Sequence, residues 1–168
     1  MTCRDYNIES ELKRWLKGAK RVVIAGIGNP IRMDDFVGVR IVQDMKGKVS
    51  DKVMLIECET VPESHMQQII EFNPTHILLI DAALLGLDPG ESRLTEPDTL
   101  VNSPAISTHI LPLRVFCDYV GRMTNSRISI LLIQPEQTDF GEELSPKINV
   151  IARSLAATLL KATSNINA

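Results

Sequence analysis

The sequence predicts an α/β fold: a three-layer sandwich in which a mostly parallel, twisted sheet of about five strands carries helices on both faces. Three observations support this prediction. Short apolar runs alternate with amphipathic segments at helical spacing along the chain. The apolar runs are almost uninterrupted, as in strands that are buried on both faces. Strands that alternate with helices imply right-handed crossovers, which make the strands parallel.

The chain has 168 residues, enough for one domain that buries about two-thirds of the surface of its unfolded form. We expect a single α/β domain over residues 21–163 and an N-terminal amphipathic helical extension over residues 1–20. In the extension, Ile8, Leu12 and Trp15 recur at helical spacing among charged residues. We expect this helix to pack against the domain.

The first half of the domain is predicted to contain two strands, each followed by a helix. Residues 21–25 are mostly apolar and β-branched, and they stop at the glycine-rich turn of residues 26–30. Apolar residues every four positions predict a helix over residues 35–46. Residues 53–57 predict the second strand, and residues 62–72 predict the second helix.

The second half of the domain continues this alternation. Residues 75–81 form the clearest buried strand, with Asp81 at its exit, and a short strand is predicted over residues 92–95. A helix begins at His109, and residues 128–133 predict the next strand. After a loop over residues 134–141, the final helix is marked by apolar residues at helical spacing: Leu144, Ile148, Ile151, Leu155 and Leu159.

The composition is that of an ordinary globular protein, with 44% hydrophobic residues, 23% charged residues and a net charge of -3. This balance argues against a nucleic-acid partner. The charged N-terminus lacks the apolar core of a signal peptide, and no later stretch approaches the roughly 20 apolar residues that span a bilayer. We therefore expect a cytoplasmic protein without membrane insertion.

The three cysteines, Cys3, Cys58 and Cys117, are widely separated and form no C-x-x-C pair. Neither a disulfide framework nor a thiolate metal site is indicated, so we expect reduced thiols. Cys117 lies in an apolar helical stretch and is expected to be a small buried hydrophobe rather than an activated nucleophile.

Three metal-competent side chains fall at the carboxyl ends of the predicted strands, where ligands bind in open α/β sheets. Asp35 follows the first strand and its turn, Asp81 ends the central strand, and His109 opens a later helix. Two carboxylates and an imidazole suit a borderline divalent ion such as nickel, zinc or manganese, with positions left for water or substrate. The arrangement is consistent with a metal site.

Each of these residues also has a structural interpretation. Asp35 could favour a helix N-terminus, Asp81 could satisfy backbone groups at a strand end, and His109 could be a partly buried residue at a helix start. From spacing alone, both interpretations stay open. We expect His65 and His76 to be structural, because neither falls in a loop predicted at the carboxyl edge of the sheet.

The glycine-rich turn begins like a dinucleotide-binding fingerprint but has Ile31 where the third glycine belongs. We therefore expect no nucleotide cofactor. Gly28 could permit a sharp turn or the close approach of a ligand or peptide, and Asn29 could fix the loop by side-chain hydrogen bonds. A purely structural turn is the alternative.

Two other kinds of hydrolytic site are disfavoured. No G-x-S-x-G sequence is present, so nothing indicates a serine enzyme of the α/β-hydrolase type. Asp34 and Asp35 are adjacent in sequence, and neighbouring side chains on a loop or helix start tend to diverge. An aspartic dyad requires two carboxyl groups that share one proton, which adjacent residues are badly placed to do.

Gly26-Ile27-Gly28-Asn29 is followed, after four residues, by Asp34-Asp35-Phe36-Val37-Gly38. This arrangement resembles the opening motif of the hydrogenase maturation protease family, G-x-G-N, four variable residues and D-[DE]-x-x-G. The family also has an acidic residue at the end of an apolar strand, here Asp81, and a histidine after a small polar pair, here Ser107-Thr108-His109. The resemblance covers roughly residues 21–160.

Residues 132–136, Leu-Ile-Gln-Pro-Glu, and the Asp-Phe-Gly of residues 139–141 are similar to one branch of this family. That branch processes formate-hydrogenlyase-type and coenzyme F420-linked hydrogenases. One departure concerns the loop after the second strand, where the family usually has a glycine before a threonine. Here Glu59 precedes Thr60. The added carboxylate is expected to alter the loop conformation or the fit of the substrate.

The resemblance implies an endopeptidase that removes the C-terminal extension of a nickel-containing hydrogenase large-subunit precursor after nickel insertion. It implies that Asp35, Asp81 and His109 act as catalytic residues and as ligands of nickel, which the precursor carries. Gly28 and Asn29 would shape the substrate loop. We expect the protein to act as a monomer. The alternative is a non-catalytic, nickel-binding maturation chaperone that binds the precursor without cleaving it.

Overall fold

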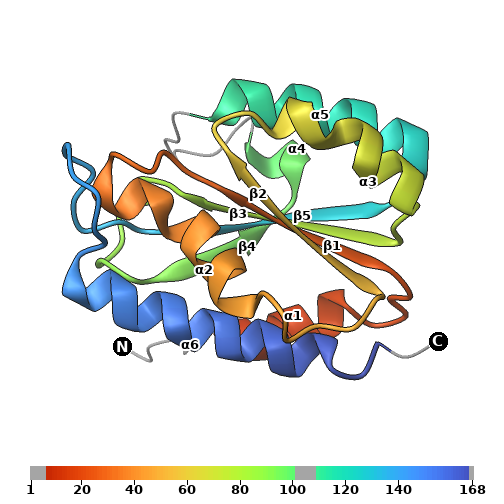
Figure 1. Ribbon diagram of the computed structural model, residues 1–168, viewed down its shortest axis with the longest axis horizontal. Coiled ribbons are helices and arrows are strands. Elements are labelled where there is room, and N and C mark those ends of the chain that lie inside the picture. Colours follow the sequence, from red (N-terminus) through yellow and green to blue (C-terminus); the bar gives the residue numbers. More distant parts are fainter. Residues whose placement is uncertain (1–6, 101–108, 167–168) are drawn as a thin grey trace.

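The computed structural model describes residues 7–100 and 109–166, which form a layered α/β structure (Figure 1). Within the described residues, five strands form one sheet in the order β2-β1-β3-β5-β4. Neighbouring strands run parallel, except that β4 runs antiparallel to β5. The predicted mostly parallel sheet is therefore confirmed. The strands are β1 (Val22–Ile27), β2 (Val53–Glu59), β3 (His76–Ala82), β4 (Ser92–Thr95) and β5 (Arg127–Ile133).

Helices cover both faces of the sheet, as the sequence predicts (Figure 1). One face packs against α1 (Ile8–Trp15), α2 (Val37–Met45) and α6 (Pro146–Thr163). The other face packs against α3 (Met66–Phe72), α4 (Pro97–Leu100) and α5 (Ile110–Thr124). Two 3₁₀ turns, η1 (Met33–Phe36) and η2 (Pro62–His65), precede α2 and α3. No helix in the described part of the chain is long and apolar enough to cross a membrane.

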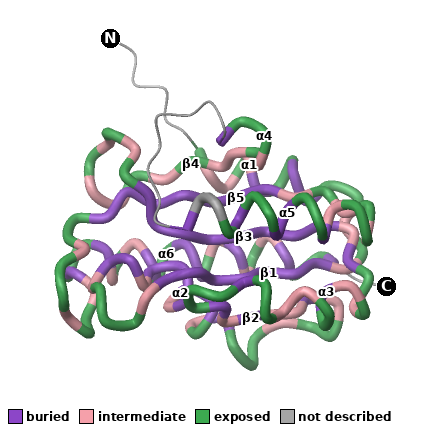
Figure 2. The backbone as a smooth tube through the Cα atoms, turned by 90° about the horizontal axis from the view of Figure 1, so that it is seen from above, coloured by how far each residue is buried: buried purple, intermediate pink, exposed green. Residues whose placement is uncertain are grey.

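Buried residues of the sheet alternate between two cores. In β3, Leu78 and Ile80 contribute to the core under α2 and α6, whereas Ile77 and Leu79 contribute to the core under α3 and α5. All residues of β3 are buried, and the tube in Figure 2 is coloured as buried along the central strands. This burial on both faces explains the uninterrupted apolar runs of the sequence.

The N-terminal helix α1 packs against α6, and its Leu12 is fully buried. At the end of α1, the Trp15 ring meets the buried His76 ring edge-on, with centroids 5.1 Å apart. Burial lowers the pKa of His76 below its usual value. His76, the first residue of β3, therefore packs against the end of α1. These contacts are consistent with its expected structural role.

Two helix starts differ from the predicted ones. The helix predicted over residues 35–46 begins with a separate 3₁₀ turn, so that Asp35 lies in η1 and α2 starts only at Val37. The final helix begins at Pro146, and Leu144 packs against the core from the preceding loop. Periodicity placed the start of the final helix too early, because an apolar residue just before a helix can pack against the same core as the helix itself.

The backbone of α2 lies directly against the backbone of the sheet. A Cβ atom at Gly38 would lie 2.1 Å from the carbonyl oxygen of Ile80, and one at Gly26 would lie 2.3 Å from the carbonyl oxygen of Gly38. Only glycine at both positions allows this approach. The contact fixes the start of α2, and with it η1, over the ends of β1 and β3.

Cys58 and Cys117 are both buried, and neither forms a disulfide bond. Burial raises the pKa of each thiol to about 12. Both thiols are therefore protonated at neutral pH and are poor nucleophiles. The expectation that Cys117 is a buried hydrophobe is confirmed.

Candidate functional site

The three candidate ligands converge at the carboxyl edge of the sheet. Asp35 lies in η1 after β1, Asp81 is next to the last residue of β3, and His109 directly precedes α5. One ligand atom from each residue lies within 4.8 Å of the other two, and all three residues are buried. Sequence positions far apart thus come together in a compact set of two carboxylates and an imidazole.

Asp81 and His109 form a close pair at the centre of this set. The Nδ1 atom of His109 lies 3.4 Å from Oδ1 of Asp81, and the backbone N–H of Ala82 donates to the same oxygen at 2.9 Å. The hydrogen bond to Asp81 raises the pKa of His109 above its usual value, with the charge of Asp35 acting in the same direction. Burial and the charge of Arg32 oppose this shift.

The loop after β1 is built to hold Asp35. The backbone N–H of Asn29 donates to Oδ2 of Asp35 at 3.0 Å, and Oδ1 of Asn29 accepts from the backbone N–H of Ile31 at 3.1 Å. The predicted fixing of the loop by the Asn29 side chain is confirmed. At Gly28, a Cβ atom would lie 2.1 Å from the carbonyl oxygen of Asp35, so the two backbone segments touch.

The neighbouring carboxylate, Asp34, has a different task. It is fully buried, and it accepts hydrogen bonds from the backbone N–H groups of Glu136, Gln137 and Ser145 and from the Ser145 hydroxyl, at 2.7 to 3.0 Å. It joins η1 to the loop between β5 and α6. Asp34 and Asp35 therefore diverge as expected and form no aspartic dyad. The structural role of Asp34 could not be predicted from the sequence, because its partners lie more than 100 residues away.

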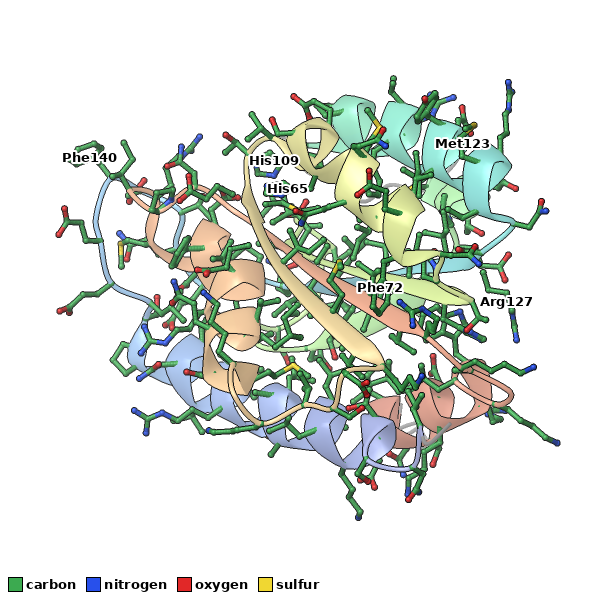
Figure 3. The ribbon with its side chains drawn as sticks, turned by 45° about the vertical axis from the view of Figure 1, so that its right-hand side comes forward. His65, Phe72, His109, Met123, Arg127 and Phe140 are labelled. Carbon is green, nitrogen blue, oxygen red and sulfur yellow. The ribbon has the colours of Figure 1, made fainter. Side chains whose placement is uncertain are left out.

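The prediction for His65 was wrong in one respect. His65 ends η2, which follows the carboxyl end of β2, so it does lie at this edge of the sheet. Figure 3 labels both His65 and His109. Among the described residues, however, the group that could hold a metal contains His109 and not His65. Ser107 and Thr108, the small polar pair before His109, lie outside the described residues.

Glu59 adopts a backbone conformation that favours glycine. It ends β2 with a φ of 50°, and its carbonyl oxygen accepts a hydrogen bond from the backbone N–H of Gly28 at 2.8 Å. The pairing of β1 with β2 shifts at this point, since Gly26 pairs with Glu57 but Ile27 pairs with Glu59. The left-handed conformation gives a physical reason for the glycine that the family usually has here.

Replacing Glu59 with glycine is expected to raise the free energy of unfolding by about 0.5–1 kcal/mol. A non-glycine residue in the left-handed region costs about 1–2 kcal/mol, and the greater freedom of glycine in the unfolded chain offsets part of this gain. Urea unfolding would measure the change. Glu59→Ala, which keeps the backbone strain, is the control, and an equal gain in both variants would attribute the effect to the charge instead.

His109 and His76 are expected to show opposite pKa shifts in protein that has been freed of metal by a chelator. The pKa of His109 is raised by its hydrogen bond to Asp81, and that of His76 is lowered by burial. We expect the NMR titration midpoint of His109 above 6.5 and that of His76 below 6.5. Because the folded pKa of His109 is raised, the pair of Asp81 and His109 stabilises the fold fully below pH 6.5, and the contribution is lost as pH rises through the raised pKa.

Asp81→Asn tests the cause of this shift. Without the carboxylate, the titration midpoint of His109 should fall, while that of His76 should not change. An unchanged midpoint for His109 would mean that Asp81 does not set its pKa.

Comparison with known proteins identifies relatives along most of the chain. Residues 39–162 match the family model described as hydrogenase maturation protease, a span that contains Asp81 and His109 but begins after Asp35. A Methanocaldococcus jannaschii protein described as a hydrogenase maturation protease is 35% identical over 154 residues, which are 87% of this chain and 90% of that protein. The hydrogenase 3 maturation protease of Escherichia coli K12 is 29% identical over 118 residues, which are 70% and 75% of the two chains.

Solved structures agree with these sequence matches. The crystal structure of a [NiFe] hydrogenase maturation protease, HycI from Thermococcus kodakarensis, superposes with a TM-score of 0.86 at 33% identity. The match covers 92% of this chain and 99% of that one. The hydrogenase maturating endopeptidase HybD from Escherichia coli has a TM-score of 0.71 at 22% identity, covering 84% and 91% of the two chains, and shows that the fold is shared.

Proposed function

This chain belongs to the hydrogenase maturation protease family, and we propose that it removes the C-terminal extension of a [NiFe] hydrogenase large-subunit precursor once nickel has been inserted. As a member of the family, the protein is an endopeptidase of hydrogenase maturation. The substrate is proposed from its relatives, which include a [NiFe] hydrogenase maturation protease of 33% identity.

The observation that carries the proposal is the buried group of Asp35, Asp81 and His109, whose ligand atoms lie within 4.8 Å of one another. Two carboxylate oxygens and one imidazole nitrogen suit nickel and other borderline divalent ions, and three protein ligands leave positions open. We propose that these positions are filled by groups of the precursor, which brings the nickel with it. The metal is then part of the substrate.

The local structure supports this role for each ligand. Asp35 is oriented by the backbone N–H of Asn29, and Asp81 is oriented by the backbone N–H of Ala82. Asp81 in turn faces Nδ1 of His109. Such partners fix the directions of ligand atoms before the metal arrives. Gly28 and Asn29 shape the loop that bears Asp35, which agrees with a role in seating the substrate rather than in bond breaking.

Nickel in this position would give the protease a means of checking its substrate. A precursor without nickel cannot bridge the three ligands, so it would bind weakly and place its peptide poorly. A precursor that carries nickel would complete a site that neither protein forms alone. Once seated, the ion would also be able to polarise a nearby peptide carbonyl as a Lewis acid.

The test is to incubate the purified protein with nickel-loaded and with nickel-free large-subunit precursor and to read the precursor mass by intact mass spectrometry. We expect loss of a C-terminal peptide from the nickel-loaded form and no change in the nickel-free form. Equal cleavage of both forms would contradict the role of nickel in recognition. Binding of the loaded precursor without any change in mass would favour the chaperone alternative.

A further inference from the structure

Large apolar side chains are exposed in the loops around the candidate site. Of the residues that the structure describes, one such side chain follows each of the four parallel strands, with exposures of 43% to 84%. They are Ile31 after β1, Val61 after β2, Leu84 after β3 and Phe140 after β5. We call this set the apolar rim.

Phe140 is the most exposed member of the rim, at 84%. In Figure 3 its ring projects from the loop before α6 at the edge of the molecule. This loop is nevertheless held firmly. The backbone N–H of Gly141 donates to the carbonyl oxygen of Ile31 at 2.9 Å, and that of Met33 donates to the carbonyl oxygen of Gly141 at 3.0 Å. Ile31 and Phe140 therefore lie on paired backbone segments.

The buried carboxylate of Asp34 strengthens this pairing, since it accepts hydrogen bonds from the Glu136 and Ser145 ends of the Phe140 loop. The loop that carries Leu84 is anchored in a similar way. Oε1 of the buried Gln134 accepts from the backbone N–H of Leu85 at 2.7 Å. Apolar side chains are thus displayed on loops whose conformation is fixed by hydrogen bonds.

Exposed apolar groups on fixed loops are typical of a surface that binds another protein. Aromatic side chains at such surfaces contribute much of the binding energy, because they bury a large area at a low cost in conformational entropy. A single exposed apolar residue needs no explanation, but one after each of four parallel strands that end at the same edge of the sheet does. Two of them also belong to the segments that bear the ligands, since Ile31 precedes Asp35 by four residues and Leu84 follows Asp81 by three.

We propose that the apolar rim docks an apolar surface of the hydrogenase precursor beside the segment that carries nickel. This inference rests on the proposed function. All three ligands are buried, and Asp81 has no exposed surface. The incoming metal must therefore be carried into the site on a projecting part of the precursor. The neighbouring part of the precursor then meets the rim. Docking through Ile31 and Phe140 would hold the precursor in place while its metal and peptide enter the site.

The test compares Phe140→Ser and Ile31→Ser with the wild-type protein in the processing of nickel-loaded precursor. We expect Phe140→Ser to raise KM roughly tenfold to a hundredfold, the range for losing an aromatic anchor, with kcat within about twofold. The split between KM and kcat matters, because a damaged ligand site would lower kcat instead.

Val150→Ser is the matched control. Val150 is an apolar residue of α6 with 65% exposure, and it is not part of the rim. We expect it to process the precursor with the wild-type KM. The same rise in KM in this variant would mean that overall surface hydrophobicity, and not the rim, governs binding.

Three results would overturn the proposal. The first is a wild-type KM in both rim variants. The second is a wild-type protein that sediments as a dimer while Phe140→Ser sediments as a monomer with unchanged KM, which would assign the rim to a second copy of the chain. The third is equal binding of the precursor to wild type and Phe140→Ser. This third measurement does not depend on cleavage, so it separates a failure of docking from a failure of the protease function.

Discussion

His109→Ala is expected to lower the rate of precursor processing by at least about 1,000-fold. The imidazole is the one nitrogen ligand in the group of Asp35, Asp81 and His109. Its loss leaves two carboxylates, a set that suits harder ions than nickel. Binding and polarisation by a metal contribute several kcal/mol to a reaction, and each 1.4 kcal/mol is a factor of ten in rate. Intact mass spectrometry over a time course would measure the loss.

The variant should remain folded, because losing the contact with Asp81 costs only about 1–3 kcal/mol of a typical total of 5–15 kcal/mol. Circular dichroism and thermal unfolding would check this. The matched control is His65→Ala, which removes an imidazole from the same edge of the sheet but not from the ligand group. We expect it to retain processing. Full activity in His109→Ala would disprove the proposed site.

Gly38→Ala is expected to destabilise the fold by about 3 kcal/mol or more. The new Cβ atom would lie 2.1 Å from the carbonyl oxygen of Ile80 and 2.7 Å from that of Ile27, so backbone rather than flexible side chains would have to move. For a chain of this length, 3 kcal/mol lowers the melting temperature by roughly 6–12 °C. Calorimetry or thermal circular dichroism would measure the shift.

Gly121→Ala is the control for this substitution. Gly121 lies within α5, and an added Cβ would meet only Cδ1 of Ile128 at 3.5 Å, an ordinary contact. Alanine in a helix interior is better than glycine by about 0.5–1 kcal/mol, so this variant should be as stable as wild type or slightly more so. Equal destabilisation by both substitutions would contradict the close packing of α2 against the sheet.

The fold was largely predictable because most of its elements are specified by local sequence, the strands by apolar runs and the helices by apolar residues at helical spacing. The uninterrupted apolar run of β3 shows that it is a central strand, and the short β4 was placed correctly at residues 92–95. The order of the strands was not predicted, because it depends on which helix crosses which face. The start of α2 was placed too early for a similar reason, since η1 is shaped by contacts with a distant loop. The start of α6 was placed too early because Leu144 packs against the core from the preceding loop.

The residues of the candidate site could be predicted, but the contacts that hold them in place could not. Asp35, Asp81 and His109 could be chosen because each follows a recognisable strand or opens a helix. The separate task of Asp34 could not, since its partners come from residues 136–145. The strain at Glu59 could be suspected only as a departure from the family pattern, because a residue name does not reveal a positive φ.

The hydrogen bonds of Asp34 also bear on when the protease becomes active during its own synthesis. Ser145 lies 111 residues after Asp34, so translation at about 5–20 residues per second separates the two by roughly 5 to 20 seconds. Until residues 136–145 have left the ribosome, the Asp34 carboxylate lacks the hydrogen-bond partners that hold η1 against that loop. The segment bearing Asp35 therefore completes its folding late, and a partly made chain does not yet present the finished group of Asp35, Asp81 and His109 to a precursor in the same cell.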